Sequence, residues 1–165
     1  GLIVFAGDCL TCIFAGVLVR ILFGESYGDS IYLLCIYTAA GAILGHNFPF
    51  YMGFKGGKGI AATAGFVLSF HPTFIPVGIL LFFGTFFLTH YVSLGSLLVY
   101  VGFMTQLIIS GQCGLFGSMT SAELIEMYIV GFLLAVMAFW KHRENIKRLL
   151  RGEERKTYLS KKNRE

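Results

Sequence analysis

Lysines and glycines are concentrated in the segment GHNFPFYMGFKGGKGIAAT, residues 45–63, which interrupts an otherwise apolar chain. Its residues suited to anion binding are Lys55, Gly56, Gly57, Lys58 and Gly59. Successive glycines let backbone N–H groups point toward a common ligand at low steric cost. The N-terminus of a helix that begins near residue 60 adds a partial positive charge, and two ammonium groups add charge-assisted hydrogen bonds. The segment is predicted to bind phosphate; the alternative is a basic loop that only sets membrane orientation.

A second polar cluster opens the C-terminal tail with the sequence KHRENIKRLL, residues 141–150. His142 and Asn145 are three positions apart and share one face of a helix. His142 can donate, accept or transfer a proton, and Asn145 can hold a hydroxyl or phosphate oxygen. The alternative is a basic helix that lies on anionic lipid, and the spacing alone favours that alternative.

Two serines, Ser93 and Ser96, lie in YVSLGS at the start of another apolar run. Serines in this position cap a helix or bind a phosphate through the hydroxyl and the backbone N–H. Neither serine lies in the G-x-S-x-G pattern of a nucleophile elbow, and the sequence shows no positioned base for a serine nucleophile. A serine hydrolase is therefore disfavoured.

Asp8 is an acid within the first apolar run. A charge at membrane depth costs about 2.5–3.5 kcal/mol on insertion scales, and such residues usually face the interior of the bundle. Asp8 is expected to orient the lysines or a substrate, or else to reach the membrane interface.

The composition excludes an ordinary soluble domain. Of the 165 residues, 56% are hydrophobic and 13% are charged, and the mean hydropathy is +0.74; soluble domains are about one quarter charged. The chain is predicted to be an all-α, polytopic membrane helical bundle. Its four cysteines are scattered through apolar sequence, so no metal site is expected, and neither a cofactor nor a nucleic-acid partner is expected.

Apolar runs long enough to cross roughly 30 Å of hydrocarbon define the predicted spans. The candidates, about six in number, are residues 2–23, 31–49, 60–71, 73–90, 93–110 and 123–140. Pro72 disfavours helix at the residue before it, so the long run 60–90 is divided there. The first piece, of about 12 residues, spans only about 18 Å as a helix and is predicted to line a cavity in the protein.

The distribution of lysines and arginines predicts the orientation of the chain in the membrane. Ten of the 13 lysines and arginines lie in residues 141–165, which are therefore placed in the cytoplasm. This tail is treated as a separate unit, helical at first, that follows the bundle of residues 1–140. Counting spans back from it puts the lysine–glycine segment, the serines and His142 at the same cytoplasmic face.

Three of these segments resemble the bacterial acyl-phosphate:glycerol-3-phosphate acyltransferases called PlsY. GHNFPFYMGFKGGKGIAAT resembles the second signature of that family, YVSLGS resembles its third segment, and HRENIKRLLRGEE is similar to its closing H-R-x-N-I-x-R-L-x-x-G-x-E. The resemblance runs from residue 1 to about residue 154. It implies an integral enzyme of the bacterial cell membrane whose active site faces the cytoplasm.

The resemblance also implies the reaction and its residues. A fatty acyl group would pass from acyl phosphate to the 1-hydroxyl of glycerol 3-phosphate, which gives lysophosphatidic acid for phospholipid synthesis. Lys58 and His142 are the expected catalytic residues. The expected substrate-binding residues are His46, Lys55, Gly56, Gly57, Lys58, Gly59, Ser93, Ser96, His142, Asn145 and Glu153. Two other functions fit the same sequence: a transporter or channel for a phosphorylated or anionic solute, and a structural subunit without chemistry.

The resemblance has three departures. The first span and first signature of the family precede the stretch that begins at Gly1, Thr11 stands where the family usually has lysine, and His90 stands where it usually has arginine. The missing signature contributes to phosphate binding in the family. We therefore expect the 165-residue chain alone to show little or no transfer, and an N-terminally extended version to be active.

Overall fold

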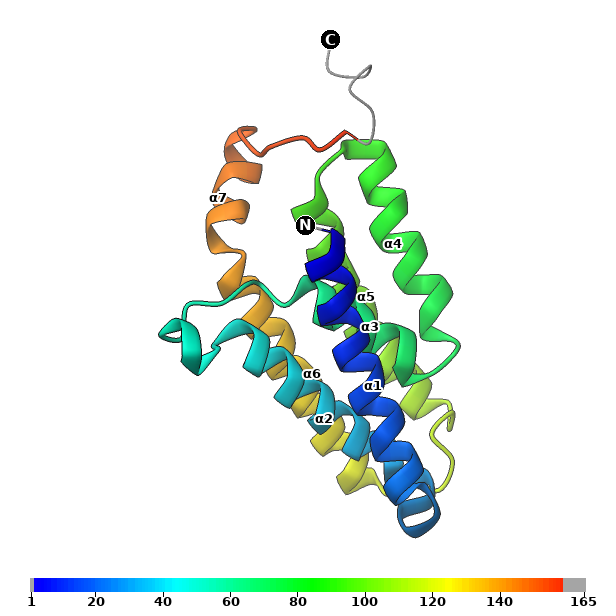
Figure 1. Cartoon of the computed structure of the whole chain (residues 1–165). Helices are drawn as coiled ribbons and strands as arrows, with labels where there is room; N and C mark the ends of the chain where they lie inside the picture. Colours follow the sequence, from blue (N-terminus) through cyan, green and yellow to red (C-terminus); the bar gives the residue numbers. More distant parts are fainter. Residues whose placement is uncertain (1, 159–165) are drawn as a thin grey trace.

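The computed structural model describes residues 2–158, which form a bundle of α-helices (Figure 1). The helices are α1 (Leu2–Tyr27), α2 (Ile31–Asn47), α3 (Ile60–Phe70), α4 (Phe74–Thr89), α5 (Val92–Gln112), α6 (Ser121–Lys141) and α7 (Arg143–Arg151). Short 3-10 turns, η1 (Gly28–Ser30) and η2 (Phe50–Met52), follow α1 and α2. All regular secondary structure in this range is helical, which confirms the all-α prediction. The end of the predicted tail, residues 159–165, lies outside the described range.

The predicted spans correspond one to one to α1–α6, with ends that differ by a few residues. By length and hydropathy, Val92–Gln112, Ser121–Lys141 and the helical region Ile3–Met52 are suited to cross a membrane. Ile60–Phe70 and Phe74–Thr89 are shorter apolar helices. The division of the long apolar run into two helices is confirmed.

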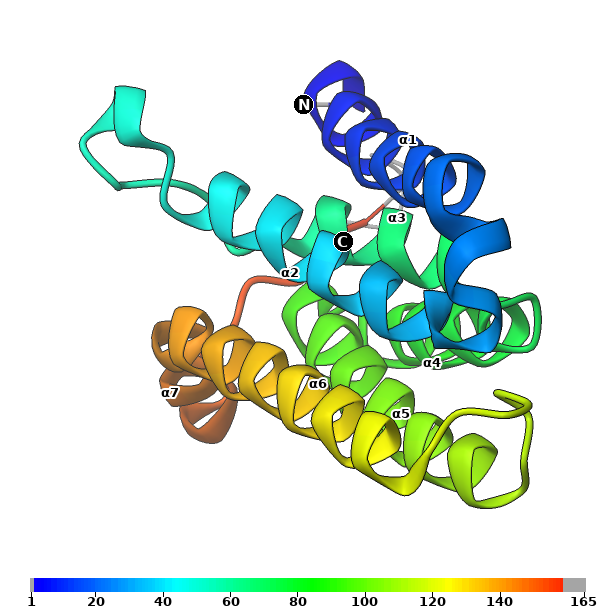
Figure 2. The same ribbon diagram turned by 90° about the horizontal axis from the view of Figure 1, so that it is seen from below.

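The helices pack in a layered bundle. α1 packs mainly on α3 and α2, α4 packs on α5, and α6 contacts both α5 and α2. Figure 2 shows α1 at one side of the bundle and α5 with α6 at the other, with α2, α3 and α4 between them. In the core, neighbouring rings of Phe66, Phe70, Phe74 and Phe103 have centroids 5.0–5.7 Å apart. These buried rings join the two short helices to α5.

The turn between α3 and α4 lies well above the lower end of α1 in Figure 1. The α3 helix ends before Pro72, and His71 takes an extended conformation with φ −156° and ψ 141°. Arg20 of α1 donates a hydrogen bond to the Phe70 carbonyl, and Gln106 of α5 donates one to the Thr73 carbonyl at 2.8 Å. Arg20 therefore satisfies a carbonyl group that the end of α3 leaves free, and Gln106 ties α5 to the turn before α4.

The chain changes direction at the end of α6 and continues as α7. Gly152, with φ +71°, ends α7 in the left-handed conformation that favours glycine. The chain then runs back toward the end of α4, where the Thr157 N–H donates to the His90 carbonyl at 2.9 Å (Figure 1). The described part of the tail therefore lies over the end of the bundle that carries the lysine–glycine segment.

Candidate active site

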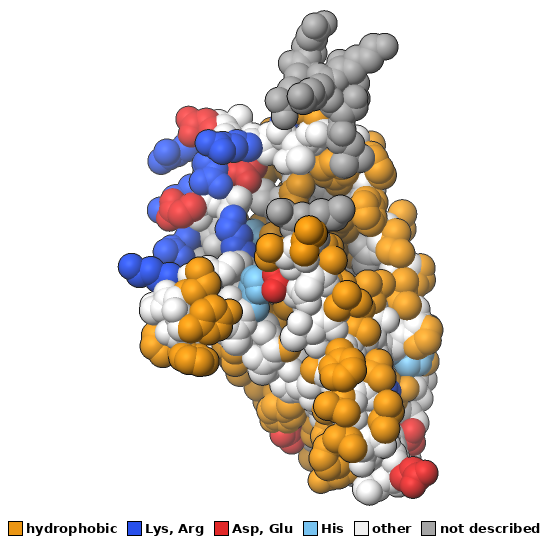
Figure 3. Space-filling view, in the orientation of Figure 1, with side chains coloured by type: hydrophobic (Ala, Val, Ile, Leu, Met, Phe, Trp, Pro, Cys, Tyr) orange, Lys and Arg blue, Asp and Glu red, His pale blue; other side chains and the backbone are white. Residues whose placement is uncertain are grey.

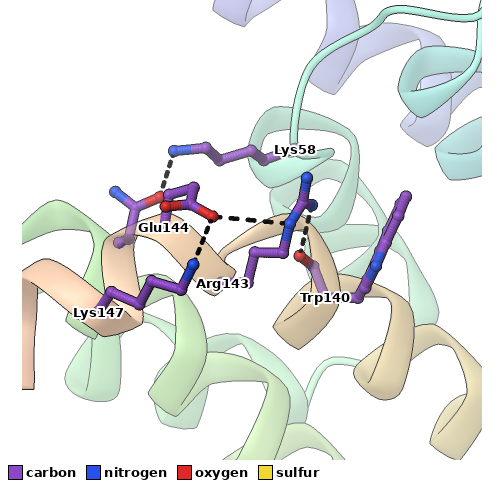
Figure 4. Close-up of polar contacts among 6 residues, drawn as sticks. Lys58, Trp140, Arg143, Glu144 and Lys147 are labelled. Atoms are coloured by element: carbon purple, nitrogen blue, oxygen red, sulfur yellow. Dashed lines mark hydrogen bonds and ion pairs between the residues drawn. The ribbon is translucent and has the colours of Figure 1, made fainter.

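The lysine–glycine segment meets the C-terminal helix through one direct contact. Lys58 Nζ donates to Asn145 Oδ1 at 2.6 Å, although the two residues are 87 positions apart. Figure 4 shows the Lys58 side chain extended from its loop toward α7. Asn145 is buried, so its amide is held in place rather than free in solvent. The structure thus brings together two of the segments that the sequence predicted to share a site.

Glu154 joins the third segment to the other two. Its Oε1 accepts hydrogen bonds from Ser93 Oγ and Asn145 Nδ2, each at 2.7 Å. Its Oε2 accepts one from Arg148 Nε, also at 2.7 Å. Its side chain is only 6% exposed. A single buried carboxylate therefore connects α5, α7 and the residues after α7, and fixes both a hydroxyl and an amide beside Lys58.

Glu153 was expected to support the glycerol phosphate site, but the acid that contacts Ser93 and Asn145 is its neighbour Glu154. The Glu153 side chain is exposed, and only its backbone N–H, which donates to the Arg148 carbonyl at 2.8 Å, takes part in ending α7. The αL turn at Gly152 reverses the chain, so the second residue after it points back toward the helix. The closing pattern G-x-E places an acid two positions after Gly152, so the sequence contained a signal for Glu154.

His142 lies between α6 and α7 and is fully buried. Its Nδ1 is 2.8 Å from the Ala138 carbonyl, which makes Nδ1 the protonated nitrogen and leaves Nε2 able to accept a proton. Nε2 has no hydrogen-bond partner among the described residues. Burial lowers the pKa of His142 below its usual value, an effect opposed by the Ala138 carbonyl and reinforced by the charge of Lys58. The imidazole is therefore neutral at neutral pH.

Burial and neighbouring groups shift the pKa values of Lys58 and Glu154. Burial lowers the pKa of the Lys58 ammonium, Glu154 opposes this effect and Arg148 adds to it. Burial raises the pKa of Glu154, but the hydrogen bonds from Asn145, Ser93 and Arg148 outweigh it, so its pKa is lower than usual. Glu154 is therefore ionised at neutral pH, and a partly desolvated cation lies beside it.

The glycines of the loop pack against the end of α2. A β-carbon at Gly56 would lie 2.1 Å from the His46 carbonyl oxygen, and one at Gly57 would lie 2.4 Å from His46 Nε2. At Gly59, with φ +76°, a β-carbon would lie 2.9 Å from Asn47 Oδ1. These positions require glycine because the end of α2 occupies the space of a side chain. His46 was expected to bind substrate, and the structure places its ring under the loop.

Two other predicted residues lie apart from the network of Lys58, Asn145 and Glu154. The Lys55 side chain is exposed, near the aromatic residues of η2. Ser96 is buried one turn below Ser93, and its hydroxyl donates to the Val92 carbonyl within α5 at 2.9 Å. Of the two serines, only Ser93 contacts the network.

Basic side chains gather over α7, while apolar side chains cover most of the visible face of the bundle (Figure 3). On the exposed side of α7, Glu144 is 3.1 Å from Lys147 and 3.8 Å from Arg143. Figure 4 shows Glu144 between these two cations. Arg143 also donates to the Trp140 carbonyl at 3.1 Å. Exposed ion pairs of this kind contribute little to stability. The excess of positive charge nevertheless favours an anionic ligand at this end of the molecule.

An apolar groove of about 360 Å³ lies between α1, α3, α4 and α5. Its walls include Cys9, Thr63, Ala64, Phe82, Ser96 and Tyr100. Ile60, the residue directly after Gly59, also lines the groove. The groove therefore begins where the lysine–glycine loop ends, and its chemistry suits a hydrocarbon chain.

The chain is similar to known proteins of a single family. A family model described as glycerol-3-phosphate acyltransferase matches residues 1–152. The chain belongs to the glycerol-3-phosphate acyltransferase family. A glycerol-3-phosphate acyltransferase of Mycoplasmopsis synoviae is 36% identical over 163 residues, covering 93% of this chain and 70% of the relative. One of Staphylococcus saprophyticus is 39% identical over 119 residues, covering 72% of this chain and 53% of the relative.

Solved structures show the same membrane fold. Crystal structures of PlsY, an integral membrane glycerol 3-phosphate acyltransferase, match with a TM-score of 0.76. The glycerol 3-phosphate form is 28% identical, and the match covers 96% of this chain and 71% of that chain. The other is the lysophosphatidic acid form. The chain is therefore a multi-pass membrane protein and an acyltransferase, and this function is favoured over the transporter or channel.

Proposed function

We propose that the chain transfers a fatty acyl group from acyl phosphate to the 1-hydroxyl of glycerol 3-phosphate. The observation that carries the proposal is the connected set Lys58, Asn145, Glu154 and Ser93, in which three separate segments meet beside the glycine loop. Ammonium and amide N–H groups that converge beside glycine backbone suit phosphate oxygens. The Ser93 oxygen, whose hydrogen is donated to Glu154, can accept a hydrogen bond from a glycerol hydroxyl. Both proposed substrates carry phosphate.

The proposed roles follow from position. Lys58 and the backbone N–H groups of Gly57 and Gly59 hold a phosphate, and the exposed Lys55 adds charge at the entrance. Gly56 shapes the loop, because its own N–H donates to the Asn47 carbonyl. Ser93 and Asn145, oriented by Glu154, hold glycerol phosphate near His142. Ser96 lies deeper, on the wall of the apolar groove.

The chemical step needs little beyond positioning, because acyl phosphate is already activated. The 1-hydroxyl oxygen attacks the acyl carbonyl carbon, a carbon–oxygen ester bond forms, and the bond to the leaving phosphate breaks. Lys58 stabilises the charge that develops on oxygen. The hydroxyl proton passes to a substrate phosphate or to the neutral Nε2 of His142. Correct alignment alone can supply roughly 7–11 kcal/mol of the barrier reduction, so no covalent enzyme intermediate is required.

We place the acyl tail of the donor in the apolar groove. The groove starts at Ile60, beside the phosphate-binding loop, and continues between α1, α3, α4 and α5. A donor that spans the two sites would hold its phosphate at Lys58 and its hydrocarbon chain within the bundle. The basic end of the bundle faces the cytoplasm in this proposal, because most lysines and arginines lie there.

The test compares Lys58→Ala with Lys156→Ala, which removes the same charge from an exposed site in the tail. Loss of a group that stabilises transition-state charge lowers the rate by about 10²–10³-fold, so we expect kcat/KM to fall by about this factor in Lys58→Ala alone. Transfer is measured in detergent with acyl phosphate and radiolabelled glycerol 3-phosphate, in the chain and in an N-terminally extended version. Product formation without a sealed membrane excludes pure transport. Equal rates for the two lysine variants would contradict the proposal.

A further inference from the structure

An acid in the first helix contacts the end of the second helix. Asp8 Oδ1 of α1 lies 3.3 Å from His46 Nδ1, which is in the last turn of α2. Both side chains are about one quarter exposed: 28% for Asp8 and 25% for His46. Neither residue contacts the network around Glu154, and the reaction as proposed assigns no role to Asp8. An acid in an apolar helix is costly, which calls for an explanation of its position.

The opposite nitrogen of the same ring lies against the phosphate-binding loop. A β-carbon at Gly57 would be 2.4 Å from His46 Nε2 and 3.2 Å from His46 Cδ2. The φ angle of Gly57 lies outside the left-handed region, so its dihedral angle alone does not demand glycine. The ring of His46 is what excludes a side chain there.

The remainder of the loop rests on the same end of α2. The Gly56 N–H donates to the Asn47 carbonyl at 3.2 Å. Lys141 of α6 donates to that same carbonyl at 2.7 Å, and its Nζ lies 4.0 Å from the centre of the Phe48 ring. The backbone of α2 is thus tied to α6, whereas the His46 side chain is tied to α1 through Asp8.

We propose that Asp8 is a positioning residue for the acyl transfer. It fixes the His46 ring, and the ring supports Gly57 so that the loop presents Lys58 and the N–H groups of Gly57 and Gly59 to phosphate. The proposal rests on the proposed function, because the loop is useful in this way only if it binds a substrate phosphate.

Hydrogen exchange of the loop tests this support without requiring activity. In detergent-solubilised chain, amide exchange in a peptide that covers residues 54–60 is compared for wild type, Asp8→Ala, His46→Ala and the double variant. Loss of a partly exposed contact between an acid and a histidine corresponds to a factor of about two to five. We expect about two- to fivefold faster exchange in each single variant and no further increase in the double variant. Asp8→Asn, which keeps an acceptor oxygen, should retain most of the protection.

Asp29→Ala is the matched control, since Asp29 is an acid at the η1 turn that accepts hydrogen bonds from Ser118. It should leave exchange of the loop unchanged. Unchanged loop exchange in Asp8→Ala, or additive effects in the double variant, would overturn the proposal. If loop exchange responds as expected but no transfer is detected in any version of the wild type, the proposed function fails and the structural support remains.

A rescue experiment tests the link to the reaction. In the N-terminally extended version, Gly57→Ala should lower kcat/KM for acyl phosphate by at least about tenfold when His46 is present and by less than about twofold in the His46→Ala background, because removal of the ring makes room for the methyl group. Gly56→Ala should be equally harmful in both backgrounds, since its β-carbon would meet the His46 carbonyl, which both variants retain. Asp8→Ala should mainly raise KM for acyl phosphate, because Asp8 affects the geometry of the loop that binds the donor's phosphate. Equal losses for Gly57→Ala in the two backgrounds would contradict the proposed support.

Discussion

At the scale of single residues, Glu154 affects ligand binding only through the side chains that it holds in place. Its negative charge would repel a phosphate in direct contact, yet it lies one hydrogen bond from Asn145 and Ser93. Arg148 pairs with its other oxygen at 2.7 Å and reduces the net charge that a ligand would meet. The carboxylate therefore orders ligand-binding groups and does not itself bind the anion.

Replacement of Glu154 tests this interpretation. Glu154→Gln keeps the size of the side chain but replaces one acceptor oxygen by a donor, so it cannot accept from Ser93, Asn145 and Arg148 together. Hydrogen bonds to charged groups are worth about 1.5–3 kcal/mol, so we expect KM for glycerol 3-phosphate to rise by about tenfold or more. Glu153→Gln, with the same change of charge at the exposed neighbour, should behave as wild type in the same assay. Equal effects of the two variants would contradict the role of Glu154.

The buried His142 predicts a dependence of stability on pH. Because burial lowers its folded-state pKa below the usual value of about 6.5, the neutral ring stabilises the fold fully above that pH. This contribution is lost as pH falls toward the folded-state pKa. The melting temperature in detergent should therefore fall between pH 7.5 and pH 5.5. The fall should be smaller in His142→Asn, which does not titrate; equal slopes would show that His142 is not responsible.

Individual site residues could be predicted only where they lie in a recognisable sequence motif. Lys58, Ser93 and Asn145 lie in the motif-like segments and meet in the structure. The closing pattern G-x-E pointed to Glu154, but helical spacing does not show which of the two acids after Gly152 turns back toward α7, because that depends on the αL turn at Gly152. His46 lies in the predicted segment, but its place beneath Gly57 depends on tertiary packing.

At the scale of helices, α3 is so short that its last carbonyl groups need a hydrogen-bond donor from another helix. Its C-terminal carbonyl groups lie within the bundle, where unpaired polar groups are costly. Arg20 donates to the Phe70 carbonyl, and its guanidinium lies 5.2 Å from the centre of the Tyr32 ring. Arg20 therefore joins α1 to the end of α3.

Removal of this donor should destabilise the bundle. Arg20→Met keeps much of the length and apolar character of the side chain but leaves the Phe70 carbonyl unpaired. We expect a loss of about 1–3 kcal/mol in the free energy of unfolding, measured by titration with a denaturing detergent. Arg151→Met, at an exposed site in α7, should change stability by less than about 0.5 kcal/mol. A loss no greater than that of Arg151→Met would contradict the role of Arg20.

The helices themselves were more predictable than their contacts. Hydropathy identified all of α1–α6, and Pro72 located the break between α3 and α4. The pairing of α1 with α3, and the carbonyl contacts of Arg20 and Gln106, could not be predicted. Those features depend on which faces of equally apolar helices meet, and a uniformly apolar helix carries little information about its partners.

At the scale of the whole molecule, the proposed orientation is open to chemical labelling. Cys113 is exposed in the turn after α5, whereas Cys12 and Cys35 are buried. This turn lies at the opposite end of α5 from Ser93. In the proposed orientation Cys113 faces the exterior.

A thiol reagent that cannot cross membranes should therefore label Cys113 in intact cells. A cysteine placed in the tail by Arg155→Cys, in a Cys113→Ser background, should be labelled only after the membrane is made permeable. Labelling is read by the mass shift of the purified chain. The reverse pattern would place the basic end outside the cell and contradict the proposed cytoplasmic site.

The apolar groove is open along its side. Among the residues that line it, Leu68 is 43%, Phe83 46% and Ile79 49% exposed, and within a bilayer these side chains face lipid. A tail can then enter laterally from the leaflet and avoid contact with water, which would cost roughly 0.8 kcal/mol for each methylene group. The enzyme should consequently obey surface-dilution kinetics: at constant total donor, added inert lipid should slow transfer as the mole fraction of donor in the membrane falls.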